Sequence, residues 1–185
     1  MDDPEMLPLL VIQPNAVTAE ILDYAVISLA GGQKDNAITR ECITEFLTDA
    51  PEEVKAYAKE LQEQIREEYT GSDENITIEV KENGVETAQV LHPTSQEKIV
   101  FYLQNVPFGI QKMSGTIKGL VESSSNIGIL RLDEDELFAS SSVRSSVDAA
   151  CSAISDKIEY LTEFLGLPFQ SSNYNLLMWR CFQFL

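Results

Sequence analysis

Few residues of this 185-residue chain have the types and spacing that catalysis requires. There is one histidine, His92, and it stands directly before Pro93. Ser-His and Cys-His nucleophile systems need at least one histidine, and hydrolytic zinc sites commonly use more than one. The sequence identifies no acidic partner for His92, and a lone histidine ahead of a helix is typically exposed or structural. We therefore expect neither a catalytic centre nor a metal site within this chain.

Acidic and serine clusters are the next candidates for chemistry. Carboxylates at 73–74 and 133–136 could bind a hard cation through oxygen, but neither run has the spacing of a calcium-binding loop. Serines cluster at 123–125, 140–142 and 145–146, and none lies in a GxSxG or SxxK motif. We interpret the acidic runs as solvated turns, the first two serine clusters as polar strand surfaces, and the third as a helix N-cap.

Arginine is scarce, with five in the chain, and two of them are more informative than the rest. Arg144 lies where an expected strand meets an expected helix, a position from which a guanidinium can bind a carboxylate through two hydrogen bonds. Arg40 is the second candidate. An ion pair within the chain, with one of its many acidic side chains, is the alternative interpretation of Arg144.

Apolar periodicity and turn residues predict the elements that would position these side chains. Pro51 in a first turn, with Asp49 and Glu52 in a capping-box arrangement, begins a helix that ends near residue 71. Capping residues at 94–97 and a strong apolar stripe over 147–165 predict two more helices. Strands are predicted at 24–29, 37–47, 76–80, 119–132, 136–144 and 169–172.

The order of these elements predicts an α+β fold, with an antiparallel sheet and helices packed on one face. The two halves, about 22–84 and 93–172, each read as helix, strand, strand, helix, strand. This order indicates a duplicated unit without a residue-level repeat. The opening helix of the first copy, at 15–22, has the weakest signal. We assign 22–172 to the domain, leave 1–21 unassigned, and treat 173–185 as an apolar tail.

Charge and composition exclude several classes of function. Thirteen Lys and Arg face thirty Asp and Glu, which gives a formal net charge of −17. Such a charge repels nucleic-acid phosphates and anionic lipids, so we expect neither nucleic acid nor membrane as a partner. Three widely spaced cysteines without a CxxC motif are typical of a reduced, cytoplasmic protein. We also expect no signal peptide and no membrane helix.

Three short segments together resemble one known family. Residues 31–42 (GGQKDNAITREC) are similar to a GG…NAIPREA stretch, and residues 118–129 (KGLVESSSNIGI) to KGVVETSLNVGVV. Residues 143–146 (VRSS) are similar to an IRS motif that also precedes a helix. The family is the bacterial aminoacyl-histidine dipeptidases, zinc exopeptidases that include bacterial carnosinases. Order and separation of the motifs agree, so the resemblance covers about residues 22–170.

The resemblance implies a specific place for this chain within a larger enzyme. In that family the region is the lid, an α+β insertion between two halves of a metal-binding domain, and lids of related zinc exopeptidases mediate dimerisation. The zinc ligands and the glutamate general base of the family lie outside the lid, so the resemblance implies no cofactor in this chain. The sequence departs from the family at Thr39, where the family has proline, over residues 1–21, and after about residue 171.

We therefore predict an isolated lid domain of an Xaa-His dipeptidase-like zinc metallopeptidase, which covers the active site of a complete enzyme and is not catalytic alone. By resemblance, Asn36 and Asn126 would hydrogen-bond a dipeptide substrate and Arg144 would clamp its terminal carboxylate, with Arg40 a weaker candidate. The expected partner is a catalytic domain or a second copy of the chain. The alternative is a free-standing interaction or dimerisation module with no peptidase role.

Overall fold

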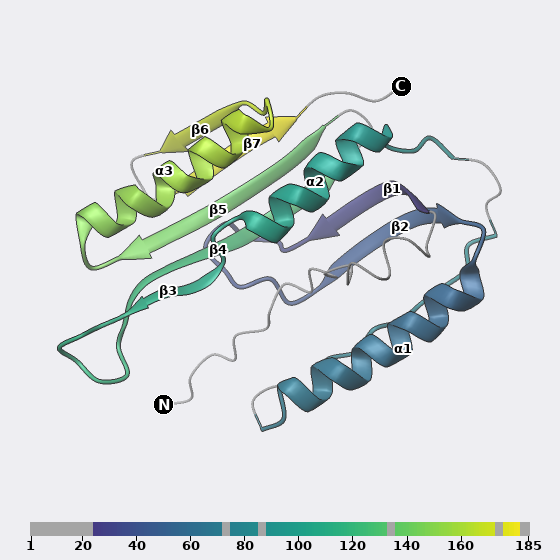
Figure 1. Ribbon diagram of the computed structural model, residues 1–185, viewed down its shortest axis with the longest axis horizontal. Coiled ribbons are helices and arrows are strands. Elements are labelled where there is room, and N and C mark those ends of the chain that lie inside the picture. Colours follow the sequence, from purple (N-terminus) through teal and green to yellow (C-terminus); the bar gives the residue numbers. More distant parts are fainter. Residues whose placement is uncertain (1–23, 72–74, 85–87, 133–135, 173–175, 182–185) are drawn as a thin grey trace.

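The computed structural model describes residues 24–71, 75–84, 88–132, 136–172 and 176–181 (Figure 1). Within them, seven strands form one antiparallel sheet in the order β2-β1-β4-β5-β7-β6, and β3 pairs with β4 outside this path. The predicted α+β class and antiparallel sheet are confirmed. The elements are β1 (Tyr24–Gly31), β2 (Cys42–Thr48), α1 (Pro51–Glu68), α2 (Pro93–Asn105), β3 (Gly109–Met113), β4 (Val121–Leu132), β5 (Leu137–Ser145), α3 (Asp148–Phe164), β6 (Phe169–Ser172) and β7 (Leu176–Cys181).

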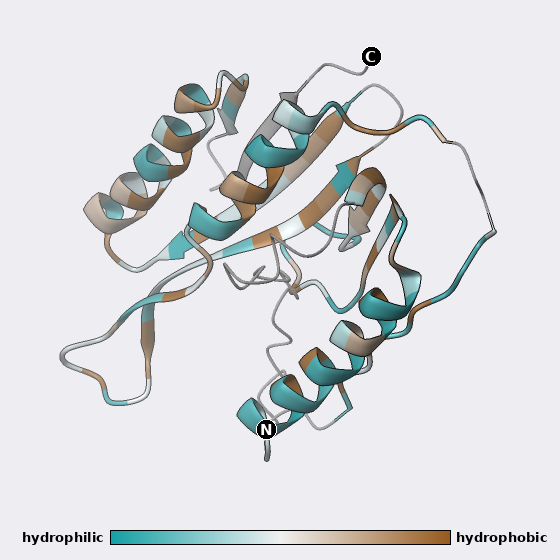
Figure 2. Cartoon of the chain, turned by 45° about the vertical axis from the view of Figure 1, so that its right-hand side comes forward, coloured by the Kyte–Doolittle hydropathy of each residue, from teal (hydrophilic) through white to brown (hydrophobic). Residues whose placement is uncertain are grey.

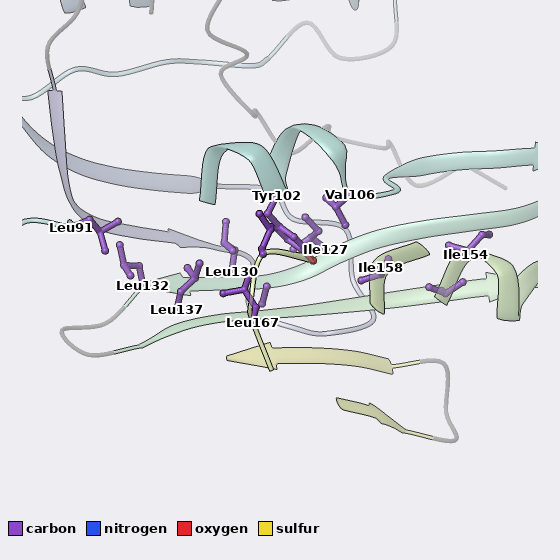
Figure 3. Packing of buried hydrophobic residues seen from close by; sticks show 13 residues of the cluster. Leu91, Tyr102, Val106, Ile127, Leu130, Leu132, Leu137, Ile154, Ile158 and Leu167 are labelled. Carbon is purple, nitrogen blue, oxygen red and sulfur yellow. The ribbon is translucent and has the colours of Figure 1, made fainter. Parts of the chain in front are cut away.

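Helices α2 and α3 pack on one face of the sheet, and the hydrophobic core lies beneath them (Figure 3). Side chains alternate between the two faces of a strand, so the core positions of β4 and β5 recur every second residue, except between Ile127 and Leu130, where the register shifts. Tyr102 of α2 and Ile158 of α3 are completely buried. Burial of an aliphatic side chain such as that of Ile158 stabilises the fold by about 1.5–3 kcal/mol. The core consists of Leu91, Tyr102, Val106, Ile127, Leu130, Leu132, Leu137, Ala139, Val143, Ile154, Ile158, Leu165 and Leu167.

Strand β4 is the longest strand, and two other strands share one of its edges. β1 pairs with it at Leu130–Leu132, and β3 pairs with it from Val121 to Ser125. β5 pairs along the opposite edge. Residues 126–129 of β4 therefore lie between the two partner strands on the shared edge, where neither β1 nor β3 reaches them.

Gln96 of α2 hydrogen-bonds the part of β1 that extends past β4. Its side-chain oxygen accepts from the Val26 amide at 2.8 Å, and its side-chain nitrogen donates to the Tyr24 carbonyl at 3.1 Å. Leu91, just before the helix, donates its amide to the Val26 carbonyl at 2.8 Å. These bonds satisfy backbone groups of β1 that a neighbouring strand would otherwise satisfy.

Helix α1 has the predicted amphipathic pattern, and the hydropathy of its residues differs between its two sides (Figure 2). Ala58 and Ile65 are its buried residues. The predicted strand at 76–80 is wrong, because the described residues 75–84 join no ladder. Side chains of α1 bind this segment instead: Gln62 accepts from the Ile78 amide at 2.6 Å, and Arg66 donates to the Ile76 carbonyl at 3.3 Å.

The helices begin at residues other than the predicted caps. The N-caps of α1 and α3 are Ala50 and Val147, and neither makes a side-chain capping bond. The predicted cap at 145–146 is therefore wrong, although the Ser145 hydroxyl accepts from the Val147 amide at 3.0 Å. His92 caps α2, because its Nδ1 accepts from the Thr94 amide at 3.3 Å, which gives the lone histidine a structural role.

Two strands differ from the predicted pattern of duplication. β3 lies in a segment for which the sequence predicts no strand, and β7 lies within residues 173–185, which the sequence indicates as an apolar tail. The second half of the chain thus has an extra strand, and the described part of the first half lacks its last one. The predicted helix at 15–22 lies outside the described residues. A search of the described part of the chain found no helix that is long and apolar enough to cross a membrane.

Candidate functional site

The loop between β1 and β2, residues 32–41, lies against β4 at the place that β1 and β3 leave open. Thr39 is only 4% exposed, and its hydroxyl donates to the Ile127 carbonyl at 2.9 Å. Two glycines allow this close approach. A Cβ on Gly128 would lie 2.3 Å from the Asp35 carbonyl oxygen, and one on Gly32 would lie 2.0 Å from the Gly128 carbonyl oxygen. Only glycine fits at either position without displacing backbone.

Gly128 also occupies an irregular position in β4. The register between β4 and β5 shifts between Ile127 and Ile129, so Gly128 is the extra residue of a β-bulge. The bulge lets both Ile127 and Leu130 reach the core beneath the helices. The bulge therefore has two effects. It places core side chains beneath the helices, and it puts Gly128 at the edge where the loop comes close to β4.

Two side chains of the opposite sheet face donate to the same loop. Asn126 of β4 donates from Nδ2 to the Ala37 carbonyl at 2.7 Å, and Arg144 of β5 donates from Nη2 to the Asn36 carbonyl at 3.2 Å. Both residues alternate with core residues of their strands, so they lie on the face that α2 and α3 do not cover. The structure thus brings together three of the four predicted site residues, which come from three separate segments.

Arg40 is the fourth predicted site residue, and it stands apart from the other three. Its side chain is exposed, and it makes no hydrogen bond or ion pair with any residue that the structure describes. Its neighbour Glu41 accepts a hydrogen bond from Gln33 at 3.0 Å, which joins the two ends of the loop. Among the described residues, Arg40 therefore has no hydrogen bond or ion pair that would fix its side chain relative to Asn36 or Arg144.

The predicted site list did not include the residues that bind the loop to the sheet. These are Thr39, Gly32 and Gly128. Thr39 carries one signal in the sequence, because the similar family has proline at that position. The glycines lie within the quoted motifs, but their roles depend on a contact between residues about ninety positions apart, which no local pattern reveals.

The chemistry available at this site is hydrogen-bond donation rather than nucleophilic attack. Arg144 and Asn36 are both exposed, and a guanidinium offers five N–H donors, of which the Asn36 carbonyl takes one. Cys42 follows the loop as an exposed residue, and partial desolvation by the surrounding protein raises the pKa of its thiol, which disfavours the reactive thiolate. Among the described residues, no three His, Cys, Asp or Glu side chains could hold a metal together.

Comparison with known proteins finds similarity to part of two longer enzymes. No family model matches the chain. Over 150 residues it is 24% identical to the cytosol non-specific dipeptidase of Escherichia coli (strain K12), an alignment that spans 80% of this chain and 31% of that enzyme. The chain is homologous to part of a dipeptidase. The resemblance seen in the three motifs is confirmed by this independent match.

The fold is also similar to part of a solved dipeptidase structure. It matches the crystal structure of aminoacylhistidine dipeptidase from Vibrio alginolyticus with a TM-score of 0.78 and 22% sequence identity. The match covers 94% of this chain and 34% of that chain. The homologous chain thus spans about a third of the length of both dipeptidases, and its fold is that of the corresponding part.

Proposed function

We propose that this chain is the lid of a dipeptidase, a domain that covers the active site and contacts the substrate without breaking the peptide bond itself. One observation carries the proposal. Asn126 and Arg144, from two neighbouring strands, converge on the loop that carries Asn36, and all of them lie on the sheet face that α2 and α3 leave uncovered. The homology to one third of a dipeptidase supports the same role.

Within this role the side chains have different tasks. Arg144 uses one donor to bind the loop, and its remaining N–H groups can bind a terminal carboxylate of a dipeptide. The exposed Asn36 side chain can hydrogen-bond a peptide carbonyl or amide. Closure of such a lid excludes water and orients the substrate.

The test is a titration of the ¹⁵N-labelled chain with carnosine (β-alanyl-histidine), followed by NMR. We expect carnosine to shift the Arg144 Nε–H and Asn36 side-chain amide signals. Carcinine, the same molecule without its carboxylate, should leave Arg144 unchanged. Arg144→Ala should abolish the shift of Asn36, and Arg66→Ala on α1 should not. Absence of any shift with carnosine, or hydrolysis of carnosine by the purified chain with added zinc or manganese, would contradict the proposal.

An exposed apolar surface favours a second candidate function, a protein-interaction or dimerisation module without a peptidase role. The hairpin of β3 and β4 extends from the rest of the sheet (Figure 1). Residues 98–121, which include β3, contain no Asp or Glu, although the chain as a whole has thirty. The exposed large apolar residues of the hairpin are Ile110, Met113, Ile117, Leu120 and Val121.

This alternative is tested by the state of association in solution. An interaction module predicts that the chain forms dimers by size exclusion with light scattering. A double variant, Ile117→Ser with Leu120→Ser, should then be monomeric. A wild-type chain that is monomeric at all concentrations while binding carnosine would favour the lid over this second candidate.

A further inference from the structure

The loop at residues 32–41 depends on one buried hydrogen bond more than on its others. The bonds from Asn126 and Arg144 are exposed to water, which competes for the same carbonyl groups. The bond from the Thr39 hydroxyl to the Ile127 carbonyl is buried. Water cannot replace a buried donor, so the Ile127 carbonyl would be left without this partner if the hydroxyl were removed.

The place of this bond along β4 explains why it can hold the loop. Ile127 lies in the stretch of β4 between its partners β1 and β3, where Thr39 supplies a donor as a partner strand would. The glycines at 32 and 128 create the room for this contact but donate no side-chain hydrogen bond. Thr39 therefore sets the distance between the loop and the strand.

Asn36 lies three residues before Thr39 in the same short loop, and its carbonyl accepts from Arg144. A shift of the loop would change the placement of the Asn36 side chain and release the Arg144 guanidinium from its contact. Both groups are thus held in one geometry by a residue that does not itself face the solvent.

We propose that Thr39 is a positioning residue, whose buried hydroxyl holds the loop against β4 and keeps Asn36 and Arg144 together as one substrate-binding unit. This inference rests on the proposed lid function, but its first test does not. The inference also gives Asn126 the task of holding the loop, since the side-chain nitrogen of Asn126 donates to the Ala37 carbonyl.

The experiment compares the full chain with Thr39→Val, which keeps the shape and removes the hydroxyl, and Thr39→Ser, which keeps the hydroxyl. Amide exchange is measured by NMR without ligand at Gly32 and Ala37, whose amides bond Glu41 and Lys34 within the loop. We expect exchange about tenfold faster in the valine variant, because a buried carbonyl loses its partner. Thr39→Ser should match the wild type. Exchange at Ile158 in α3 reports whether the fold is intact.

Carnosine titration supplies the readout that a purely structural role would not change. Its affinity should fall about tenfold in the valine variant and recover in the serine variant. Unchanged exchange at Gly32 and Ala37 in the valine variant would overturn the inference, whatever carnosine does. Faster exchange with unchanged carnosine affinity would overturn the positioning role. Failure of the wild type to bind carnosine would instead contradict the lid function, and the exchange result would still decide whether Thr39 holds the loop.

Discussion

Replacing Gly128 with alanine tests how closely the loop must approach β4. The added Cβ would lie 2.3 Å from the Asp35 carbonyl oxygen and 2.4 Å from that of Lys34, whereas ordinary contact begins at 3.4 Å. The obstructing atoms belong to backbone, so no side chain can turn away to make room. The loop must therefore retreat by about 1 Å.

A retreat of about 1 Å breaks the contacts that hold the loop. The bonds from Asn126 to the Ala37 carbonyl and from Thr39 to the Ile127 carbonyl measure 2.7 and 2.9 Å, so both would exceed hydrogen-bonding distance. The Ile127 carbonyl would lose its buried partner as well. We expect Gly128→Ala to lower the free energy of unfolding by about 2–4 kcal/mol.

The assay is urea unfolding followed by circular dichroism, with Gly115→Ala as the matched control. A Cβ on Gly115 would meet nothing within 4 Å, so this variant should be neutral or stabilised by up to about 1 kcal/mol. The two variants introduce the same methyl group and differ only in the space it enters. If their unfolding free energies agreed within about 0.5 kcal/mol, the reasoning about the loop would be refuted.

Three further predictions concern the core, a helix cap and a thiol. Ile158→Ala should destabilise the fold by about 2–5 kcal/mol because the side chain is completely buried, and urea unfolding measures this. Tyr160→Ala, at a position 77% exposed, should stay within about 0.5 kcal/mol of the wild type in the same assay. His92→Ala should cost about 0.5–2 kcal/mol, since the Thr94 amide loses its acceptor, and His92→Asp should restore that stability. Partial desolvation raises the pKa of the exposed Cys42, so less thiolate is present at a given pH. Its alkylation by iodoacetamide, followed by peptide mapping, should reach half-maximal rate at a higher pH than alkylation of free cysteine, and equal midpoints would contradict the raised pKa of this thiol.

Local periodicity predicted the elements whose stability comes from a single apolar face. Helices α1 and α3 and strands β4 and β5 lie where the spacing of apolar residues indicated. Residues 76–80 show where such reasoning fails. Ile76 and Ile78 alternate in burial with their neighbours, as in a strand, yet their backbone groups bond side chains of α1. Periodicity indicates which residues face the protein interior. It does not indicate which groups form hydrogen bonds with the backbone of those residues.

The sequence fails to predict strands β3 and β7 for a different reason. β3 contains Gln111 and Lys112 and is mostly exposed, so it offers no apolar pattern, and its formation depends on pairing with β4. β7 pairs with β5 about forty residues earlier in the chain. The candidate site likewise depends on pairing between strands. Family resemblance indicated which residues belong to it, but not that they lie together. Their convergence on residues 36–37 follows only from the sheet.

The long separation of the site residues along the chain also sets the order in which the site can form. β1 and β2 are neighbours in sequence and can pair as a hairpin early, but the loop between them is bonded by residues 88, 89 and 108 positions away. Closing such long loops is slower than local pairing because of its entropic cost. The loop therefore reaches its final conformation only after β4 and β5 have joined the hairpin. A probe attached to it would report the completion of folding, rather than its beginning.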